Sequence, residues 1–195
     1  MNRLFLLSLG WCSLFLHCAG PVLNMQNASV AGKQSDVQKI AILDFEFDRP
    51  EYEVISLGNI RRPKNAGSIL ADVFTEVLLN TDLYQLIERR QIERILNEAG
   101  LSMSGIFESR SLKEVGQMLN VDGLVVGTVS EYCDYQSVLN WGADVDFSAR
   151  LIELRSGIVL WSVSARRNLG ASNSGITGHA AVTAAVQELL KKMGR

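Results

Sequence analysis

The sequence predicts an α/β (α+β) fold, in which one domain holds a mixed, mainly antiparallel β-sheet packed by about four helices. Two patterns lead to this prediction. Apolar and polar residues alternate on both sides of the turn Arg155-Ser156-Gly157, as they do in a β-hairpin that buries one face. In other stretches, such as 66–80, apolar residues recur every three or four positions, as they do in helices that cover a sheet.

The expected strands are 39–47, 84–87, 123–129, 145–151 and 159–165. In 39–47, Ala41 and Leu43 lie on one face of the strand, and Ile40 and Ile42 lie on the other. We therefore expect the first half of this strand to be buried on both faces. The strand at 123–129 is nearly all apolar and is expected at the centre of the sheet. Pro50, Gly58 and Pro63 interrupt the stretch 48–65, which predicts a long loop there.

The expected helices are 66–80, 89–99, 112–120 and 177–192. Gly100 suits the left-handed residue that ends many helices. Ser111 and Glu114 have the spacing of a capping box, in which each side chain bonds the backbone of the other residue.

The N-terminus predicts export. Arg3 is followed by a stretch, 4–19, without a formally charged side chain, which is shorter than the about 20 residues that a spanning helix needs. We therefore expect a signal peptide over 1–19. Cleavage before Cys18 would make it a lipid-modified N-terminus. Two alternatives remain: cleavage at the small-residue site Ser29-Val30-Ala31, which would extend the leader to 31, and a retained anchor.

The rest of the chain divides into two parts. Residues 20–37 are small and polar, so they predict a flexible tether, and the domain is expected over 38–195. The formal net charge of −2 argues against nucleic acid as a partner. The stretch 170–177 copies the spacing of a phosphate-binding P-loop, but Ile176 stands where the lysine belongs, so nucleotide hydrolysis is not expected.

The side chains that could carry chemistry are few. His17 lies in the leader, His179 has no cysteine nearby to complete a zinc site, and no nucleophile-elbow pattern occurs in the chain. Asp44, Glu46 and Asp48 could hold a calcium ion, although a solvated edge or salt bridges to arginine are the favoured interpretation. We therefore expect no enzymatic activity, no cofactor and no metal.

Two groups of residues are candidates for contacts with other molecules. Charged residues gather where the second strand meets the second helix, either as a solvated helix face or as a contact between subunits: Glu88, Arg89, Arg90, Glu93 and Arg94. An aromatic and apolar group lies between the third and fourth strands, and would either touch a membrane or partner or fold back onto the sheet: Tyr132, Tyr135, Leu139 and Trp141.

Four stretches, in this order, resemble the CsgG family of curli-secretion lipoproteins and its relatives. They are KIAILDFEF at 39–47, LYQLIERRQIERILNEAGLSMSG at 83–105, VDGLVVGTVSEY at 121–132 and ARLIELRSGIVLWS at 149–162. The resemblance implies a fold like that of CsgG and of the TolB N-terminal domain. It also implies a non-enzymatic protein attached to the outer membrane and facing the periplasm, and several family members form rings that export polymers or protein subunits.

The chain departs from the pore-forming members in one respect. Those members carry two long β-hairpins, each of which needs strands of about 9–11 residues to cross a membrane. We expect 130–142 to be a link between strands and 48–65 to be the loop at the place of the family's channel constriction. This leaves no room for two dedicated hairpins, so the resemblance supports attachment and assembly more than a self-built pore.

These observations lead to one expected function and one alternative. The expected function is that of a homo-oligomeric lipoprotein on the periplasmic face of the outer membrane, working with other envelope proteins in a curli-like or polymer export and assembly system. The alternative is a monomeric lipoprotein that docks on a peptidoglycan synthase. The oligomeric state separates the two.

Overall fold

Eight strands form one mixed β-sheet in the part of the chain that the computed structural model describes, which is residues 26–31, 36–47, 49, 52–55, 59–101, 111–136, 141–166 and 178–194. The strands are β1 (Gln26–Val30), β2 (Lys39–Ile42), β3 (Tyr52–Ile55), β4 (Asn59–Arg62), β5 (Gln85–Leu86), β6 (Gly123–Gln136), β7 (Trp141–Glu153) and β8 (Val159–Ala165). Their order is β1-β8-β7-β6-β2-β5, with β4 beside β6 and β3 beside β4. β2 runs parallel to β5 and β6, and the other pairings are antiparallel, so the predicted mixed sheet is confirmed.

The predicted helices are also confirmed, with ends that differ by no more than a residue or so. They are α1 (Ala66–Leu79), α2 (Arg89–Glu98), α4 (Leu112–Leu119) and α5 (Gly178–Lys192). The capping box is present, since the Glu114 amide donates to Ser111 Oγ at 3.3 Å and the Ser111 amide donates to Glu114 Oε2 at 3.2 Å. Gly100 follows α2 with a φ of +72°, in the left-handed region.

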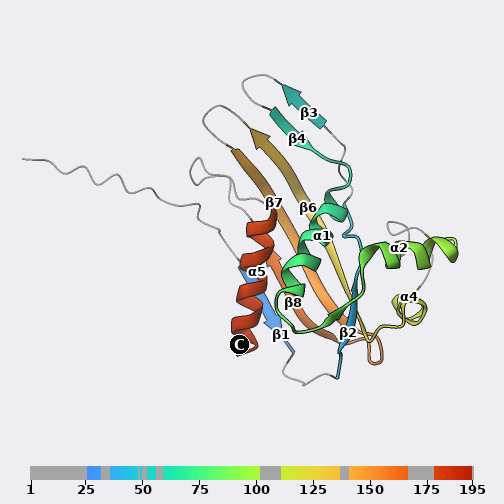
Figure 1. The fold of residues 1–195 in the computed structure, drawn as a ribbon. Helices are drawn as coiled ribbons and strands as arrows, with labels where there is room; N and C mark the ends of the chain where they lie inside the picture. Colours follow the sequence, from blue (N-terminus) through green and yellow to red (C-terminus); the bar gives the residue numbers. More distant parts are fainter. Residues whose placement is uncertain are drawn as a thin grey trace, which may run out of the picture.

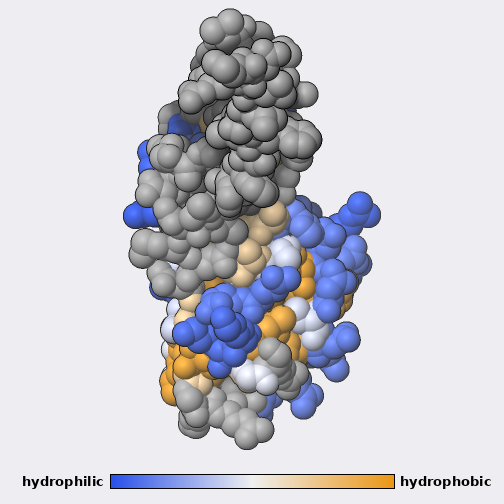
Figure 2. All heavy atoms as spheres, turned by 90° about the vertical axis from the view of Figure 1, so that its left-hand side faces the viewer, coloured by the Kyte–Doolittle hydropathy of each residue, from blue (hydrophilic) through white to orange (hydrophobic). Residues whose placement is uncertain are grey.

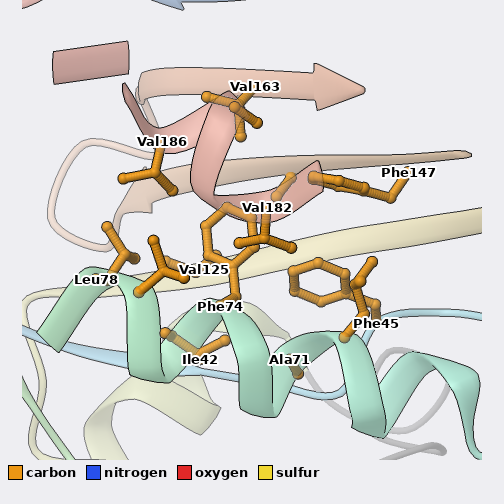
Figure 3. Close-up of a cluster of buried hydrophobic side chains, with 14 of the residues drawn as sticks. Ile42, Phe45, Ala71, Phe74, Leu78, Val125, Phe147, Val163, Val182 and Val186 are labelled. Carbon is orange, nitrogen blue, oxygen red and sulfur yellow. The ribbon is translucent and has the colours of Figure 1, made fainter. Parts of the chain in front are cut away.

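The larger core lies between the sheet and the pair α1 and α5, which cover one face of it side by side (Figure 1). Phe74 of α1 is at its centre (Figure 3). Its ring centroid lies 5.6 Å from that of Phe45, 5.9 Å from Phe147 in an edge-on arrangement, and 6.4 Å from Trp161. The Trp161 indole donates a hydrogen bond to the Tyr84 hydroxyl at 3.1 Å, so its polar atom is satisfied.

A smaller core lies on the second face of the sheet, under α2 and α4. It joins Ile92 and Leu96 of α2 with residues of α4 and of two central strands. Further buried residues come from α4, from β6 and from the segment 39–43, which contains β2 and which we call the β2 segment: Val115, Leu119, Leu124, Val126, Ala41 and Leu43. Because Ile40 and Ile42 face the larger core, the β2 segment is buried on both sides, as its sequence predicts.

The structure differs from the expected tether at 20–37. Residues 26–30 form β1, and all five pair in regular antiparallel register with β8. The reason is non-local, because the hydrogen-bond partners of β1 lie more than 130 residues away, as in the Ser29–Ser162 contact of 2.8 Å between the two Oγ atoms. A short polar strand of this kind has no local pattern that distinguishes it from a linker.

The structure also corrects the loop at 48–65 and the link at 130–142. Strands β3 and β4 form a hairpin within the first stretch, and β4 pairs with the distal half of β6, where Ile60 lies opposite Tyr135. Strands β6 and β7 run on through the second stretch, with only 137–140 between them. An irregularity in the pairing between Val129 and Glu131 interrupts the alternation of β6, which is why the sequence appears to end the strand there.

Together these four strands make an extension of the sheet beyond the helices, at the top of Figure 1. We call it the distal extension: β3, β4, and residues 131–136 of β6 with 141–146 of β7. Strands of four residues reach roughly 13 Å. β3 and β4, with 4 residues each, are therefore shorter than the about 9–11 residues that a membrane-crossing strand needs, whereas β6 has 14 residues and β7 has 13.

Candidate functional surfaces

Arg89, the second residue of the predicted charged group, is a structural side chain. It is 9% exposed and forms ion pairs with Asp44, which follows β2, and with Asp72 of α1. It also donates to Ser68 Oγ at 3.1 Å and to the Ile42 carbonyl at 3.4 Å. A buried guanidinium needs such partners, and these join α2 to α1 and β2. The assignment of Arg89 to a subunit contact is therefore corrected.

The other charged residues at this junction remain candidates. Glu88, Arg90, Glu93 and Arg94 are exposed. Arg90, Glu93 and Arg94 lie at positions i, i+3 and i+4 of α2, so they share one face of the helix, which we call the charged face. Within the described residues none of these three forms an ion pair. Their role in a subunit contact stays a prediction.

Three residues of the predicted aromatic group, Tyr132, Tyr135 and Trp141, belong to strands of the distal extension. Tyr132 is 7% exposed, and its ring lies against Gly178 at the start of α5, where an added Cβ would come within 3.2 Å of it. Tyr132 is thus part of the core edge, which corrects its assignment to a membrane or partner contact. The side chains of Tyr135 and Trp141 and the whole of Leu139 lie outside the described residues, so their role stays a prediction.

A polar hollow of about 370 Å³ lies on the second face of the sheet, beside the half that α2 and α4 cover. Its wall on that side includes Leu112 of α4, and its charged residues are Glu46 and Arg150. Its floor is made of small hydroxyl side chains from β6, β7, β8 and β1: Thr128, Ser148, Ser162, Ser164 and Ser29. The sequence shows these residues as the polar positions of alternating strands. It does not show which half of the face the helices leave open.

Two of the remaining candidates for chemistry, Asp44 and His179, have structural partners. Asp44 binds Arg89, as the salt-bridge interpretation predicts. His179 Nε2 lies 3.7 Å from a Glu76 carboxylate oxygen, and its Nδ1 lies 3.3 Å from Thr183 Oγ1. Across the described stretches, no three His, Cys, Asp or Glu side chains gather as a metal site would require. Asp48, Cys18 and the P-loop-like stretch 170–177 lie outside the described residues.

The surface on the α5 side of the molecule is mixed. Figure 2 shows hydrophilic and hydrophobic areas interleaved over the described part of this face. Within the described residues, the exposed large apolar side chains are Val30, Leu79, Ile158 and Val159. No described helix combines the length and the apolar character that crossing a membrane requires.

A sequence profile for the curli production assembly/transport component CsgG matches residues 23–191. The chain belongs to the CsgG family. The family resemblance found in the sequence is thereby confirmed, and the match begins just before β1, whose pairing places it in the sheet.

A curated relative of this CsgG-family chain is named as a lipoprotein. A protein of Neisseria meningitidis serogroup B that is named as a lipoprotein is 29% identical over 112 residues, which are 56% of this chain and 52% of that protein. The chain thus spans about half the length of the curated relative it matches.

Two solved structures resemble the fold. The crystal structure of lipoprotein GNA1162 from Neisseria meningitidis is 19% identical, with a TM-score of 0.51, over 80% of this chain and 98% of that one. The PelC dodecamer from Paraburkholderia phytofirmans is 13% identical, with a TM-score of 0.47, over 87% of this chain and 96% of that one. At 19% identity, the likeness to the Neisseria lipoprotein is one of fold.

Proposed function

We propose that this CsgG-family chain is a non-enzymatic lipoprotein on the periplasmic face of the outer membrane. It acts there as a homo-oligomeric component of a curli-like or other polymer export and assembly system. The observation that carries the proposal is the match of the profile of an assembly and transport component over residues 23–191. A subunit without a reaction centre can still shape a passage when copies of it repeat around an axis.

Two observations support processing at Cys18. Cleavage at the alternative site after Ala31 would remove β1, and with it five residue pairs on β8. Cleavage before Cys18 leaves β1 intact, and the Neisseria relative is named as a lipoprotein. From Cys18 to Gln26 the chain advances eight residues (26 − 18), which span at most about 29 Å when fully extended. A lipid on Cys18 therefore holds the domain close to the membrane.

The end of the sheet that faces this anchor also bears the distal extension. Gln26 lies opposite Ala165, which lies opposite Phe147, and the extension begins at the next residue of β7 toward its tip. The first residue of β1 and the base of the extension are thus in one row of the sheet. This arrangement favours an orientation in which the extension points toward the membrane.

The absence of catalysis in the proposal rests on how the reactive side chains are used. Arg89 holds both Asp44 and Asp72, and His179 is placed between Glu76 and Thr183. These residues serve the packing of α1, α2 and α5. A variant at Asp44 or His179 is therefore expected to change stability rather than abolish a turnover.

The experiment that tests this proposal measures the molar mass, and so the number of copies, of the purified protein. The full chain is expressed in a host that processes lipoproteins, extracted in mild detergent and measured by size-exclusion chromatography with light scattering. The expected result is one species of several copies, each at or somewhat below the 21.5 kDa of the unprocessed chain. A monomer at micromolar concentration would overturn the oligomeric proposal and favour the alternative of a lipoprotein docking on a peptidoglycan synthase.

A further inference from the structure

The polar hollow lies on the half of a sheet face that no described helix covers, while described helices cover the other half. On that face, α2 and α4 pack on β2 and β6, while the hollow extends over β7, β8 and β1. The floor carries serine and threonine side chains, such as Ser148 and Ser164 opposite each other on β7 and β8. Small side chains on the floor leave room for the backbone of a docking helix to come close.

The hollow holds two opposite charges that have no ion pair within the described residues. Glu46 and Arg150 both line it and both are exposed. The backbone of Glu46 forms an isolated parallel β-bridge with Thr128 of β6. Thr128 in turn pairs with Ser148 of β7, which is two residues from Arg150. Two strand spacings and two residues along a strand place the Cα atoms of Glu46 and Arg150 about 12 Å apart.

The charged face of α2 has a complementary arrangement. Arg90 and Arg94 lie next to each other on one face of the helix, one turn apart, and Glu93 lies at the edge of that face. This set presents two positive charges and one negative charge, against one negative and one positive in the hollow. The side chains of arginine and glutamate are long enough to bridge the difference between the helical spacing and the spacing in the hollow.

The two surfaces lie toward opposite ends of one face of the sheet. In Figure 1, α2 is on the right of the sheet and β1, at the far side of the hollow, is on the left. Two unlike patches at separate places on a subunit produce a head-to-tail contact, which repeats from copy to copy and closes into a ring when the rotation allows it.

We propose that the charged face of α2 in one copy docks into the polar hollow of the next copy. Glu93 faces Arg150 of that copy, and Arg90 and Arg94 face its Glu46. This inference rests on the proposed homo-oligomeric function and identifies the interface that builds the oligomer. Charge pairing and the fit of the helix against the small-residue floor determine the specificity of the contact.

The test is a charge swap between the two surfaces in the full-length, processed protein. Glu93→Arg and Arg150→Glu each place like charges opposite each other, so each single variant should raise the dissociation constant of the oligomer by about tenfold or more. The double variant restores opposite charges with reversed sign and should recover most of the wild-type affinity. Light scattering over a dilution series measures all four proteins.

Matched controls are available on the same elements. Glu98→Arg reverses an exposed charge on another part of α2, and Arg155→Glu reverses one in the turn after β7. Both should assemble like the wild type, and circular dichroism should give the same helix content for every variant.

The outcomes separate this inference from the function on which it rests. If the wild type is oligomeric and the single variants assemble equally well, the proposed interface is wrong while the oligomer stands. If both single variants dissociate and the double variant does not recover, Glu93 and Arg150 do not face each other and the inference also fails. A monomeric wild type overturns the proposed function and this inference together.

Discussion

Arg62 of β4 donates two hydrogen bonds to Glu131 of β6. Its Nη2 lies 2.6 Å and its Nε 3.0 Å from the same carboxylate oxygen, and the side chains are 15% and 32% exposed. The pair stands at the base of the distal extension, next to the irregularity in β6 that follows Val129. It fastens the β3–β4 hairpin to the sheet at the point where the regular core ends.

Removing the hydrogen bonds between Arg62 and Glu131 should loosen the β3–β4 hairpin and leave the core intact. Glu131→Gln replaces the carboxylate by a neutral amide, so the charge-assisted bonds are lost and the free energy of unfolding should fall by about 1–2 kcal/mol. Hydrogen exchange of the backbone amides in 52–62 should quicken, while exchange in α1 and β8 should not change. The control is Asp146→Asn, which breaks the more exposed pair with Arg166, where the arginine is 71% exposed. Equal exchange in 52–62 for Glu131→Gln and the wild type would contradict the assignment.

Arg89→Ala should be among the most destabilising substitutions on α2. It leaves Asp44 without its arginine and removes the link between α2, α1 and β2, so we expect a loss of about 3 kcal/mol. Arg90→Ala, one residue further on the exposed face, should change stability by less than about 0.5 kcal/mol. Urea unfolding followed by circular dichroism measures both. Similar losses for the two variants would show that Arg89 is not the structural residue described above.

Two glycines in helices should respond differently to alanine. A Cβ at Gly67 would collide with the Phe45 backbone carbonyl, which cannot move without displacing the backbone segment that follows β2. A Cβ at Gly116 would instead meet the flexible end of the Leu154 side chain. Gly67→Ala should therefore cost about 2–3 kcal/mol. Gly116→Ala should cost about 1 kcal/mol or less, because the helix gains from alanine what the displaced leucine loses. Thermal unfolding ranks the two, and the opposite order would refute the close approach of α1 to Phe45.

Cys18→Ser should release the protein from the membrane. Without the thiol no lipid can be attached, so labelled palmitate should not be incorporated and the chain should move from the membrane to the soluble or unprocessed fraction. Cys12→Ser, within the leader, should leave labelling unchanged. Mass spectrometry of the mature N-terminus provides the decisive reading, since a chain beginning after Ala31 would have lost β1 and would contradict the proposed processing.

Much of the scaffold could be predicted from contiguous residues. The helices follow from apolar spacing, and the start of α4 follows from Ser111 and Glu114, which act on each other over a single turn. The part of β6 at 123–129 was expected at the centre of the sheet because nearly every residue in it is apolar, and β2 was expected to be buried on both faces. Each of these features depends on interactions within one segment or on burial alone, and both leave a mark in the local sequence.

The parts that bear on function were settled by contacts between distant segments. β1 is a strand because β8 offers it partners, and β4 is a strand because the distal half of β6 does. Its sequence neighbours place Arg89 on a charged helix face. It has a structural role because the fold puts the carboxylates of Asp44 and Asp72 beside its guanidinium. The sequence by itself determined which segments are helices and central strands, through their periodicity. Only the tertiary structure decided which polar residues stay open to a partner, because that depends on which half of a sheet face the helices cover.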